Sequence, residues 1–175
     1  MGRGDSVPYN NVTMEYRNYQ LEIIEKETEI FKRSSLLYLA MEVRTGKTLT
    51  SFGICDNTKA KNVLFITKKK AIESILSDYS ARTHPFSLEV INYESLHKLD
   101  EDIDYYIIIC DEAHCMGAFA KPSKRAIQVR DLLKKHRAKL MLMSGTPTPE
   151  RFSQIYHQVY GHPSNPFSKY KNFYR

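Results

Sequence analysis

Two short stretches of the sequence carry side chains that could act on a phosphate ester. The first is "GKT" at residues 46–48, and the second is the acidic pair Asp111 and Glu112. Glycine, lysine and threonine end the phosphate-binding pattern G-x-x-x-x-G-K-[ST], in which the lysine contacts the outer phosphates and the hydroxyl contacts Mg²⁺. Two adjacent acids suit two tasks, because one can hold the metal ion while the other orients and deprotonates a water.

The phosphate-binding pattern is incomplete, because Met41 occupies its first glycine position. The predicted secondary structure around the loop nevertheless supports a phosphate-binding role. The apolar run "LLYLAM" (36–41) ends at the loop, and a helical pattern begins directly after it, which is the context such a loop requires. Gly46 would let the backbone approach a phosphate, and the N–H groups of the helix start would face the anion. We therefore predict a nucleotide site, with Lys47 on the outer phosphates and Thr48 on Mg²⁺.

Small hydroxyl residues follow another apolar run, in "LMLMSGTPTPE" (140–150). Ser144 and Thr146 could hydrogen-bond the neighbouring acidic strand and so sense the nucleotide. A plainer interpretation is a strand-to-helix turn, in which Thr148 caps the next helix and Pro149 is its first residue. The two interpretations are compatible, because Thr148 would cap the helix while Ser144 and Thr146 would contact the acidic strand.

These side chains need a scaffold that brings them together. Short apolar runs alternate with amphipathic segments, which predicts an α/β fold with a mainly parallel sheet and helices on both faces. The predicted strands are residues 36–41, 62–67, 88–92, 105–110 and 139–144. The predicted helical segments are one that starts at residue 16 and those at 47–55, 70–82, 93–99, 124–137 and 149–161. Such a sheet places its ligands at the carboxyl ends of the strands, where the acidic pair lies.

Length and composition predict one domain in a reducing compartment. The chain has 175 residues and a formal net charge of +6, which allows an anionic partner without requiring one. Residues 1–30 are acidic, with 3 basic and 6 acidic side chains, so the basic excess lies in the rest of the chain. The three cysteines lack metal-ligand spacing, and no segment has the apolar length of a membrane span, which predicts a cytoplasmic protein without a membrane partner. Five histidines show no ligand pattern and are predicted at the surface: His84, His97, His136, His157 and His162.

Taken together, the motifs resemble those of the first RecA-like lobe of a superfamily-two helicase or translocase. "RTGKT" (44–48) resembles motif I, "DEAH" (111–114) resembles motif II, and "SGTP" (144–147) resembles motif III. "YRNYQ" (16–20) is similar to the glutamine motif of the Swi/Snf-like branch, and the stretch that begins with motif III looks most like phage-encoded members. The resemblance covers about residues 15–175.

The resemblance implies a RecA-like P-loop NTPase lobe that uses ATP and Mg²⁺ and acts on DNA. It divides the chain into a flexible leader at 1–14, the ATP-binding domain at 15–168, and the start of a linker at 169–175. That linker would lead to a second RecA-like lobe, which is absent from the printed sequence. Alone, the lobe is expected to bind nucleotide weakly and hydrolyse it slowly, because the second lobe supplies the arginine finger.

Within the nucleotide site, the resemblance assigns roles to individual residues. Asp111 and Thr48 would hold Mg²⁺, Glu112 would activate the attacking water, and Gln20 would read the adenine edge. The predicted nucleotide contacts in the loop are Arg44, Thr45, Gly46, Lys47 and Thr48. Arg44 departs from the usual glycine, and its side chain could reach a phosphate or lie on the surface.

Outside the nucleotide site, the resemblance implies coupling and nucleic-acid contacts. Three residues would couple the nucleotide to motif III: His114, Ser144 and Thr146. Three lysines after a predicted strand would contact the nucleic-acid backbone by charge, independently of sequence: Lys68, Lys69 and Lys70. The alternative for these lysines is a solvated helix start. Lys68 also departs from the usual proline of motif Ia.

Two other functions remain open. The chain could be an RNA helicase lobe, because D-E-A-H also occurs there, or a single-lobe module that binds nucleic acid without turnover. The forms "YRNYQ" and "SGTPT" favour the DNA branch by likeness. DNA is therefore the predicted partner, with RNA as the alternative, and the host cytoplasm is the predicted location if the chain is phage-encoded.

Overall fold

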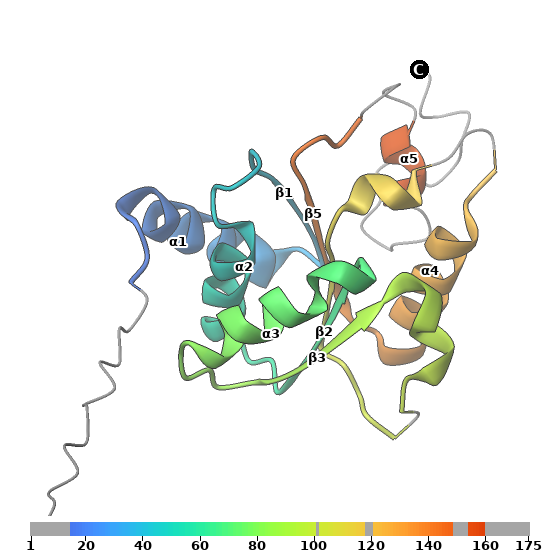
Figure 1. Ribbon diagram of the computed structural model, residues 1–175, viewed down its shortest axis with the longest axis horizontal. Helices are drawn as coiled ribbons and strands as arrows, with labels where there is room; N and C mark the ends of the chain where they lie inside the picture. The colour runs from blue at the N-terminus through green and yellow to red at the C-terminus, as the bar shows by residue number, and fades with distance from the viewer. Residues whose placement is uncertain (1–14, 101, 118–120, 149–153, 160–175) are drawn as a thin grey trace, which may run out of the picture.

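A five-stranded sheet forms the centre of the computed structural model, which describes residues 15–100, 102–117, 121–148 and 154–159 (Figure 1). Every strand pairs in parallel, in the order β1-β5-β4-β2-β3. The strands are β1 (Leu36–Ala40), β2 (Asn62–Thr67), β3 (Ser87–Asn92), β4 (Ile107–Cys110) and β5 (Lys139–Ser144). All five predicted strands are present, and their ends agree with the prediction to within two residues.

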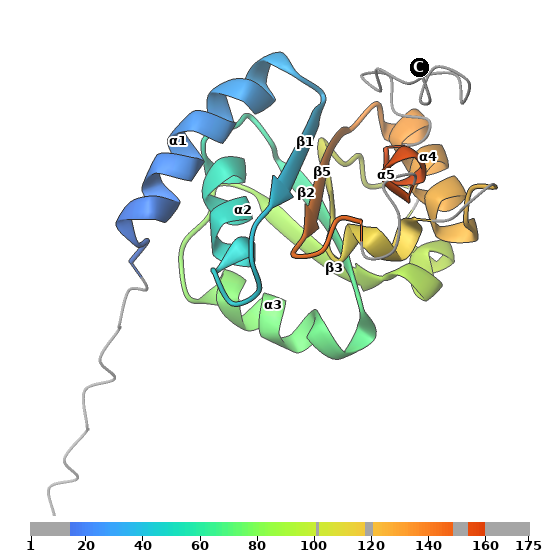
Figure 2. The same ribbon diagram turned by 90° about the horizontal axis from the view of Figure 1, so that it is seen from above.

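Helices cover both faces of the sheet, which confirms the predicted α/β architecture (Figures 1 and 2). The α-helices are α1 (Asn18–Arg33), α2 (Lys47–Asp56), α3 (Ile72–Ser80), α4 (Lys124–His136) and α5 (Gln154–Gln158). The 3-10 turns are η1 (Lys69–Ala71), η2 (Tyr93–Lys98) and η3 (Ala113–Met116). The predicted helix at 149–161 is represented by α5, and Pro149 lies outside the described residues, as do the predicted leader and linker.

The sheet separates two apolar cores. On one face, Phe65 of β2 packs with α1, α2 and α3, and its ring centroid lies 5.9 Å from that of Phe52. On the other face, Leu64 and Ile66 pack with η2, η3 and α4. Successive residues of β2 thus serve opposite cores, which is why the strand is a continuous apolar run rather than an alternating one.

The carboxyl end of α1 is attached to β5. Lys139 Nζ donates hydrogen bonds to the carbonyl oxygens of Phe31, Lys32 and Ser34, at 2.5, 3.2 and 3.0 Å. Burial lowers the pKa of Lys139. These carbonyls are the groups that a helix end leaves without partners, so the lysine stabilises the end of α1.

Three of the histidines predicted at the surface have buried side chains, His84, His136 and His157, which corrects that prediction. The side chain of His84 is fully buried, with Nδ1 2.7 Å from Asp56 Oδ1 and its ring stacked on Tyr79. His157 is only 3% exposed, while His162 lies outside the described residues. The prediction failed because the absence of a ligand pattern does not determine packing: the His84 ring lies against Tyr79 and Phe86, and the His157 ring lies against Tyr156. Among the helices described, none combines the length and apolar character that a membrane span requires.

Candidate functional site

The order of the strands brings the three predicted motifs to one edge of the sheet. β1 lies beside β5, and β5 lies beside β4, with all three running in the same direction. The loop after β1, the end of β5 at Ser144 and the acidic pair after β4 therefore share the carboxyl edge. Parallel sheets bind their ligands at this edge.

Gly46 makes the turn from the loop into α2. Its φ of 76° lies in the left-handed region, and a Cβ atom there would lie 2.6 Å from Gln20 Nε2. Both facts explain glycine at this position. No side chain caps the start of α2, so the first N–H groups of the helix point at the loop without a side-chain acceptor. That geometry suits a phosphate.

Lys47 closes the loop on itself. Its Nζ donates hydrogen bonds to the carbonyl oxygens of Met41, at 3.2 Å, and Glu42, at 3.0 Å. Thr45 Oγ1 donates to the same Glu42 carbonyl, at 2.7 Å. An ammonium group held only by carbonyl oxygens can transfer to phosphate oxygens, which carry more negative charge.

Arg44 has a left-handed backbone, with φ 65°, and is exposed. An arginine pays a conformational cost in this region that glycine does not. The next residue, Thr45, is fastened to α1, because its carbonyl accepts a hydrogen bond from Tyr19 Oη at 2.9 Å. Thr48 is half-buried in the first turn of α2.

Gln20 ties α1 to the end of the loop. The side chain is 3% exposed, and its Oε1 accepts the main-chain N–H of Arg17 at 2.9 Å. Its Nε2 donates to the Gly46 carbonyl at 3.2 Å and to Thr50 Oγ1 at 3.3 Å. The amide is therefore engaged within the protein, and contact with an adenine edge would require it to exchange these partners.

Asp111 is anchored from the neighbouring strand. Its Oδ2 accepts a hydrogen bond from Thr67 Oγ1 at 2.8 Å, and its carbonyl oxygen accepts one from Tyr93 Oη at 2.8 Å. Burial raises the pKa of Asp111, while the Thr67 hydrogen bond and the charge of Lys47 oppose that rise. The strand order places the loop and the acidic strand end at the same edge of the sheet, which agrees with the effect of the Lys47 charge on the pKa of Asp111.

The roles of Thr67 and Tyr93 were not predicted from the sequence. One signal for Thr67 was available, because it is a polar residue at the end of an otherwise apolar strand. Nothing local pointed to Tyr93.

The predicted coupling residues contact one another. Glu112 has a left-handed backbone, with φ 51°, and its Oε2 lies 3.2 Å from His114 Nδ1. The same Nδ1 lies 3.0 Å from Ser144 Oγ, and the N–H of Thr146 donates to Ser144 Oγ at 3.1 Å. A continuous polar path thus joins the acidic pair to the loop after β5.

Helix α5 supports the loop after β5, a contact that the sequence did not predict. Tyr38 Oη in β1 donates to Gln158 Oε1 at 2.5 Å, and Gln158 Nε2 donates to the Pro147 carbonyl at 2.6 Å. Burial raises the pKa of Tyr38, so the phenol remains a donor. One amide thereby links β1 to the loop.

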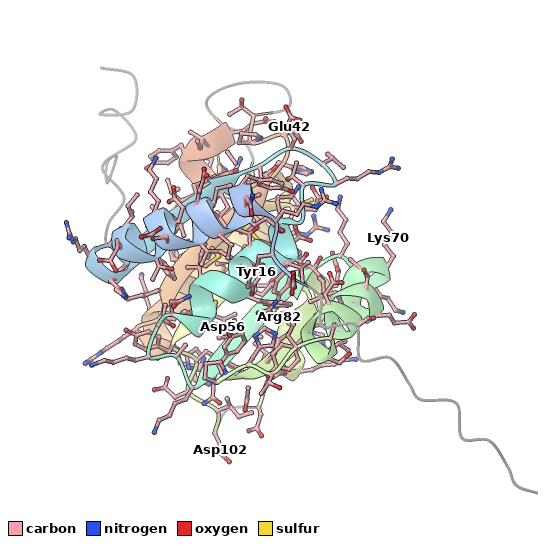
Figure 3. All side chains as sticks on the ribbon, turned by 90° about the vertical axis from the view of Figure 1, so that its left-hand side faces the viewer. Tyr16, Glu42, Asp56, Lys70, Arg82 and Asp102 are labelled. Atoms are coloured by element: carbon pink, nitrogen blue, oxygen red, sulfur yellow. The ribbon has the colours of Figure 1, made fainter. Side chains whose placement is uncertain are left out.

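The three predicted nucleic-acid lysines lie just beyond β2. All three are exposed, and Figure 3 shows Lys70 extending away from the ribbon. Lys69 and Lys70 are in η1, and the Ala71 N–H donates to the Lys68 carbonyl at 2.9 Å. Their charges are therefore available to a polyanion.

The residues predicted to hold Mg²⁺ fit that ion. Asp111 and Thr48 offer a carboxylate and a hydroxyl, and Mg²⁺ prefers oxygen ligands. The described part of the chain contains no group of three or more His, Cys, Asp or Glu side chains that could hold a metal by themselves. Mg²⁺ in nucleotide sites is held by one or two protein oxygens together with substrate phosphates, which agrees with this small donor set.

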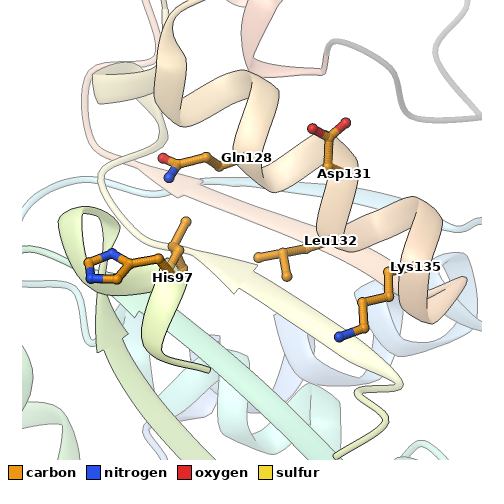
Figure 4. A pocket seen from close by; sticks show the side chains of 6 residues that line it. His97, Gln128, Asp131, Leu132 and Lys135 are labelled. Atoms are coloured by element: carbon orange, nitrogen blue, oxygen red, sulfur yellow. The ribbon is translucent and has the colours of Figure 1, made fainter. Parts of the chain in front are cut away.

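A separate groove lies between η2 and α4 (Figure 4). It has a volume of about 280 Å³ and shares no residue with the loop or the acidic pair. Its lining residues are Leu96, His97, Gln128, Asp131, Leu132 and Lys135. The lining contains side chains of both charges and none of the predicted site residues.

Comparison with known proteins supports the fold. Residues 13–85 match the family model described as Type III restriction enzyme, res subunit, a stretch that includes the loop and ends before the acidic pair. No curated protein matches the chain. A nuclease-deletion mutant of the Type ISP restriction-modification enzyme LlaGI, in complex with a DNA substrate mimic, is similar in structure. It has a TM-score of 0.55, 16% identity, and coverage of 77% of this chain and 18% of that chain.

The ATP-dependent Type ISP restriction-modification enzyme LlaBIII, bound to DNA, is similar to the same degree. Its TM-score is 0.55 and its identity 18%, with coverage of 77% of this chain and 13% of that chain. At these identities the likeness establishes the fold, which is that of a RecA-like domain. The chain spans less than a fifth of the length of either structure.

Proposed function

We propose that this chain is the ATP-binding lobe of a DNA-dependent ATPase of the superfamily-two helicase and translocase class. Such a protein couples hydrolysis of Mg·ATP to movement on DNA. The observation that carries the proposal is that the strand order brings Lys47 and the acidic pair to one edge of the sheet. The match to a restriction-enzyme subunit and the likeness to DNA-bound enzymes support DNA as the partner.

Each residue of the site has a task in this proposal. The N–H groups at the start of α2 and the ammonium of Lys47 bind the phosphates of ATP. Thr48 and Asp111 bind Mg²⁺, which when bound neutralises charge that develops on the phosphates. Glu112 orients the attacking water and accepts its proton. His114, Ser144 and Thr146 pass the state of the site to the loop after β5.

We further propose that a second RecA-like lobe in the same protein completes the site. The arginine finger of NTPases is worth about 10³–10⁵ in rate, so this lobe alone should turn over slowly. Lys68, Lys69 and Lys70 are proposed to grip the nucleic-acid backbone. Assignment to the Swi/Snf-like branch, a phage origin and a cytoplasmic location remain proposals from the motif resemblance.

The test is ATP hydrolysis with and without nucleic acid, in a protein that carries both lobes. Duplex DNA is expected to stimulate the wild type more than RNA does, and Lys47→Ala is expected to abolish the stimulated rate. Lys59→Ala is the matched control, because Lys59 is exposed in the turn after α2 and away from the loop. An unchanged rate in Lys47→Ala would refute the proposal, and stronger stimulation by RNA would assign the lobe to an RNA helicase.

The alternative without turnover makes a different prediction. A module that only binds nucleic acid would bind DNA in a salt-dependent way and would show no heat of Mg·ATP binding. Calorimetry of the chain with Mg·ATP therefore separates the two functions.

A further inference from the structure

We propose that Thr67 is a positioning residue for the metal-binding carboxylate of Asp111. The inference rests on the proposed function, because it assumes that Asp111 contributes to the Mg²⁺ site. It concerns a residue that has no predicted role of its own, at the last position of β2.

Thr67 is placed beside Asp111 by the register of the sheet. Ile66 of β2 pairs with Cys110 of β4, so the residues that follow each of them are also neighbours. The Asp111 N–H donates to the Ile66 carbonyl at 2.8 Å, which extends the strand pairing to Asp111 itself. Thr67 Oγ1 then reaches Asp111 Oδ2 at 2.8 Å.

The hydroxyl of Thr67 is a polar group in an apolar place. Thr67 is 0% exposed, as are the residues before it from Val63 to Ile66. A valine would have nearly the same shape and would suit a buried strand better, because an unsatisfied hydroxyl costs free energy when buried. The hydrogen bond to Asp111 satisfies that hydroxyl, and it is the feature that distinguishes threonine from valine at this position.

The main chain of Asp111 is held as firmly as its side chain. Tyr93 is 1% exposed, and its Oη donates to the Asp111 carbonyl at 2.8 Å. With the N–H bonded to Ile66, three hydrogen bonds fix the position of Asp111 and the direction of its carboxylate. The β-branched side chain of Thr67 has few rotamers, so its hydroxyl is itself well placed.

Directional support matters for Mg²⁺, because this ion demands nearly ideal octahedral geometry with short bonds to oxygen. A carboxylate that rotates freely must be ordered when the metal binds, which weakens the affinity. Substitution of a residue that orients a metal ligand typically costs about 10- to 100-fold in metal affinity. We expect a loss of that size when the Thr67 hydroxyl is removed.

The experiment measures metal binding directly. Mn²⁺ replaces Mg²⁺ as a spectroscopic probe, since it accepts the same oxygen ligands. Mn²⁺ bound to the chain is followed by the enhancement of the water-proton relaxation rate in saturating ADP, against a blank with the same Mn²⁺ and ADP but no protein, because ADP itself binds Mn²⁺. Thr67→Val is expected to weaken Mn²⁺ binding about 10- to 100-fold. Thr67→Ser keeps the hydroxyl and is expected to bind Mn²⁺ with the affinity of the wild type.

Two further variants secure the result. Thr58→Val is the matched control, because Thr58 Oγ1 donates to the Cys55 carbonyl at 2.7 Å after α2, away from the acidic pair. It should leave Mn²⁺ binding unchanged. Thr67→Ala removes the hydroxyl without placing a methyl group against the carboxylate, so it tests the same bond if Thr67→Val does not fold.

The outcomes distinguish this inference from the proposed function. If the wild type binds no Mn²⁺ in the presence of ADP, the proposed function fails. If the wild type binds Mn²⁺ and the variants without the hydroxyl bind it equally well, the positioning role of Thr67 is wrong while the site stands. An equal loss in Thr67→Ser would also overturn it, because the effect would then come from packing.

Discussion

The phosphate loop and the acidic strand end lie at the same edge of the sheet but are built differently. The loop is partly exposed, and its lysine is bonded to the carbonyl oxygens of Met41 and Glu42. The acidic end is anchored by Thr67 and Tyr93, which are both buried. The lysine of one half thus bonds within its own loop, whereas the acidic residue of the other half is supported by β2 and η2.

Under the proposed function, this difference indicates which half of the site changes when a nucleotide binds. Lys47 has to leave two carbonyl oxygens to reach a phosphate, so the loop loses two internal hydrogen bonds when a phosphate binds. Asp111 can keep all its protein hydrogen bonds and still offer a carboxylate. We therefore expect substitution of Glu112 to affect chemistry more than nucleotide binding, and substitution of Gly46 to affect nucleotide binding and stability.

The largest expected effect concerns the chemistry of the acidic half. Glu112→Gln removes the base that accepts the proton of water, so the nucleic-acid-stimulated rate should fall about 10²–10⁴-fold. Mg·ATP binding should persist, because the phosphate contacts are intact. Steady-state hydrolysis and calorimetry measure the two quantities. Glu94→Gln, an exposed acid paired with Arg125, is the control and should change neither. If Mg·ATP affinity fell as much as the rate, the acidic half would contribute to nucleotide binding as well as to chemistry, which contradicts the expected difference from the loop.

The next effect concerns the turn into α2. Gly46→Ala places a Cβ atom 2.6 Å from Gln20 Nε2 at a φ of 76°, so the substitution combines a steric clash with backbone strain. The free energy of unfolding should fall by about 1–3 kcal/mol, and nucleotide affinity should fall with it. Urea denaturation measures the first quantity. A variant of unchanged stability would show that the loop tolerates other backbone conformations.

Substitution of Asp111 is expected to have a smaller effect on the free energy of unfolding, and to raise it rather than lower it. Burial raises its pKa above that in the unfolded chain, so the folded state takes up the proton more readily. The stability from this group is present at acidic pH and is lost as the pH rises through the folded pKa. Asp111→Asn removes the buried charge and should raise the free energy of unfolding at neutral pH by about 1 kcal/mol.

Urea denaturation between acidic and neutral pH checks this prediction. The wild type should lose more stability than Asp111→Asn as the pH rises. Asp102→Asn serves as the control, because Asp102 is exposed and should keep the wild-type profile. If the free energy of unfolding depended on pH identically in Asp111→Asn and the wild type, burial of the Asp111 charge would not destabilise the fold.

The smallest effect is expected at Arg44. Arg44→Gly relieves a left-handed backbone and should raise the free energy of unfolding by at most about 1 kcal/mol. Arg137 ends α4 with a φ of 49°, so Arg137→Gly is a matched substitution outside the site. Thermal denaturation should show a similar gain for both. A loss of stability in Arg44→Gly alone would mean that the arginine side chain stabilises the loop.

The fold could be predicted from the sequence because its signals are local. β2 and β4 are buried on both faces and therefore appear as continuous apolar runs. The same reasoning placed the loop and the acidic pair at strand ends, and the parallel order of the strands brings them to one edge.

The supporting contacts could not be predicted, because their partners are distant in sequence. Thr67 and Asp111 are 44 residues apart, and Tyr38 and Gln158 are 120 apart. Local periodicity does not determine which strands become neighbours, so it cannot pair these side chains. The bond from the Gln20 amide to the loop is another such contact, 26 residues apart in sequence, and the contact of Gln20 with adenine stays a prediction.

The central claim is that the loop and the acidic pair form one nucleotide site, and an NMR titration tests it most directly. Mg·ADP is added to the ¹⁵N-labelled chain, and the amide resonances of both regions are followed. We predict that the amides of residues 46–48 and of Asp111 and Glu112 shift together, with one dissociation constant. The claim would be contradicted if only one of the two regions shifted, or if the shifts were confined to the groove between η2 and α4.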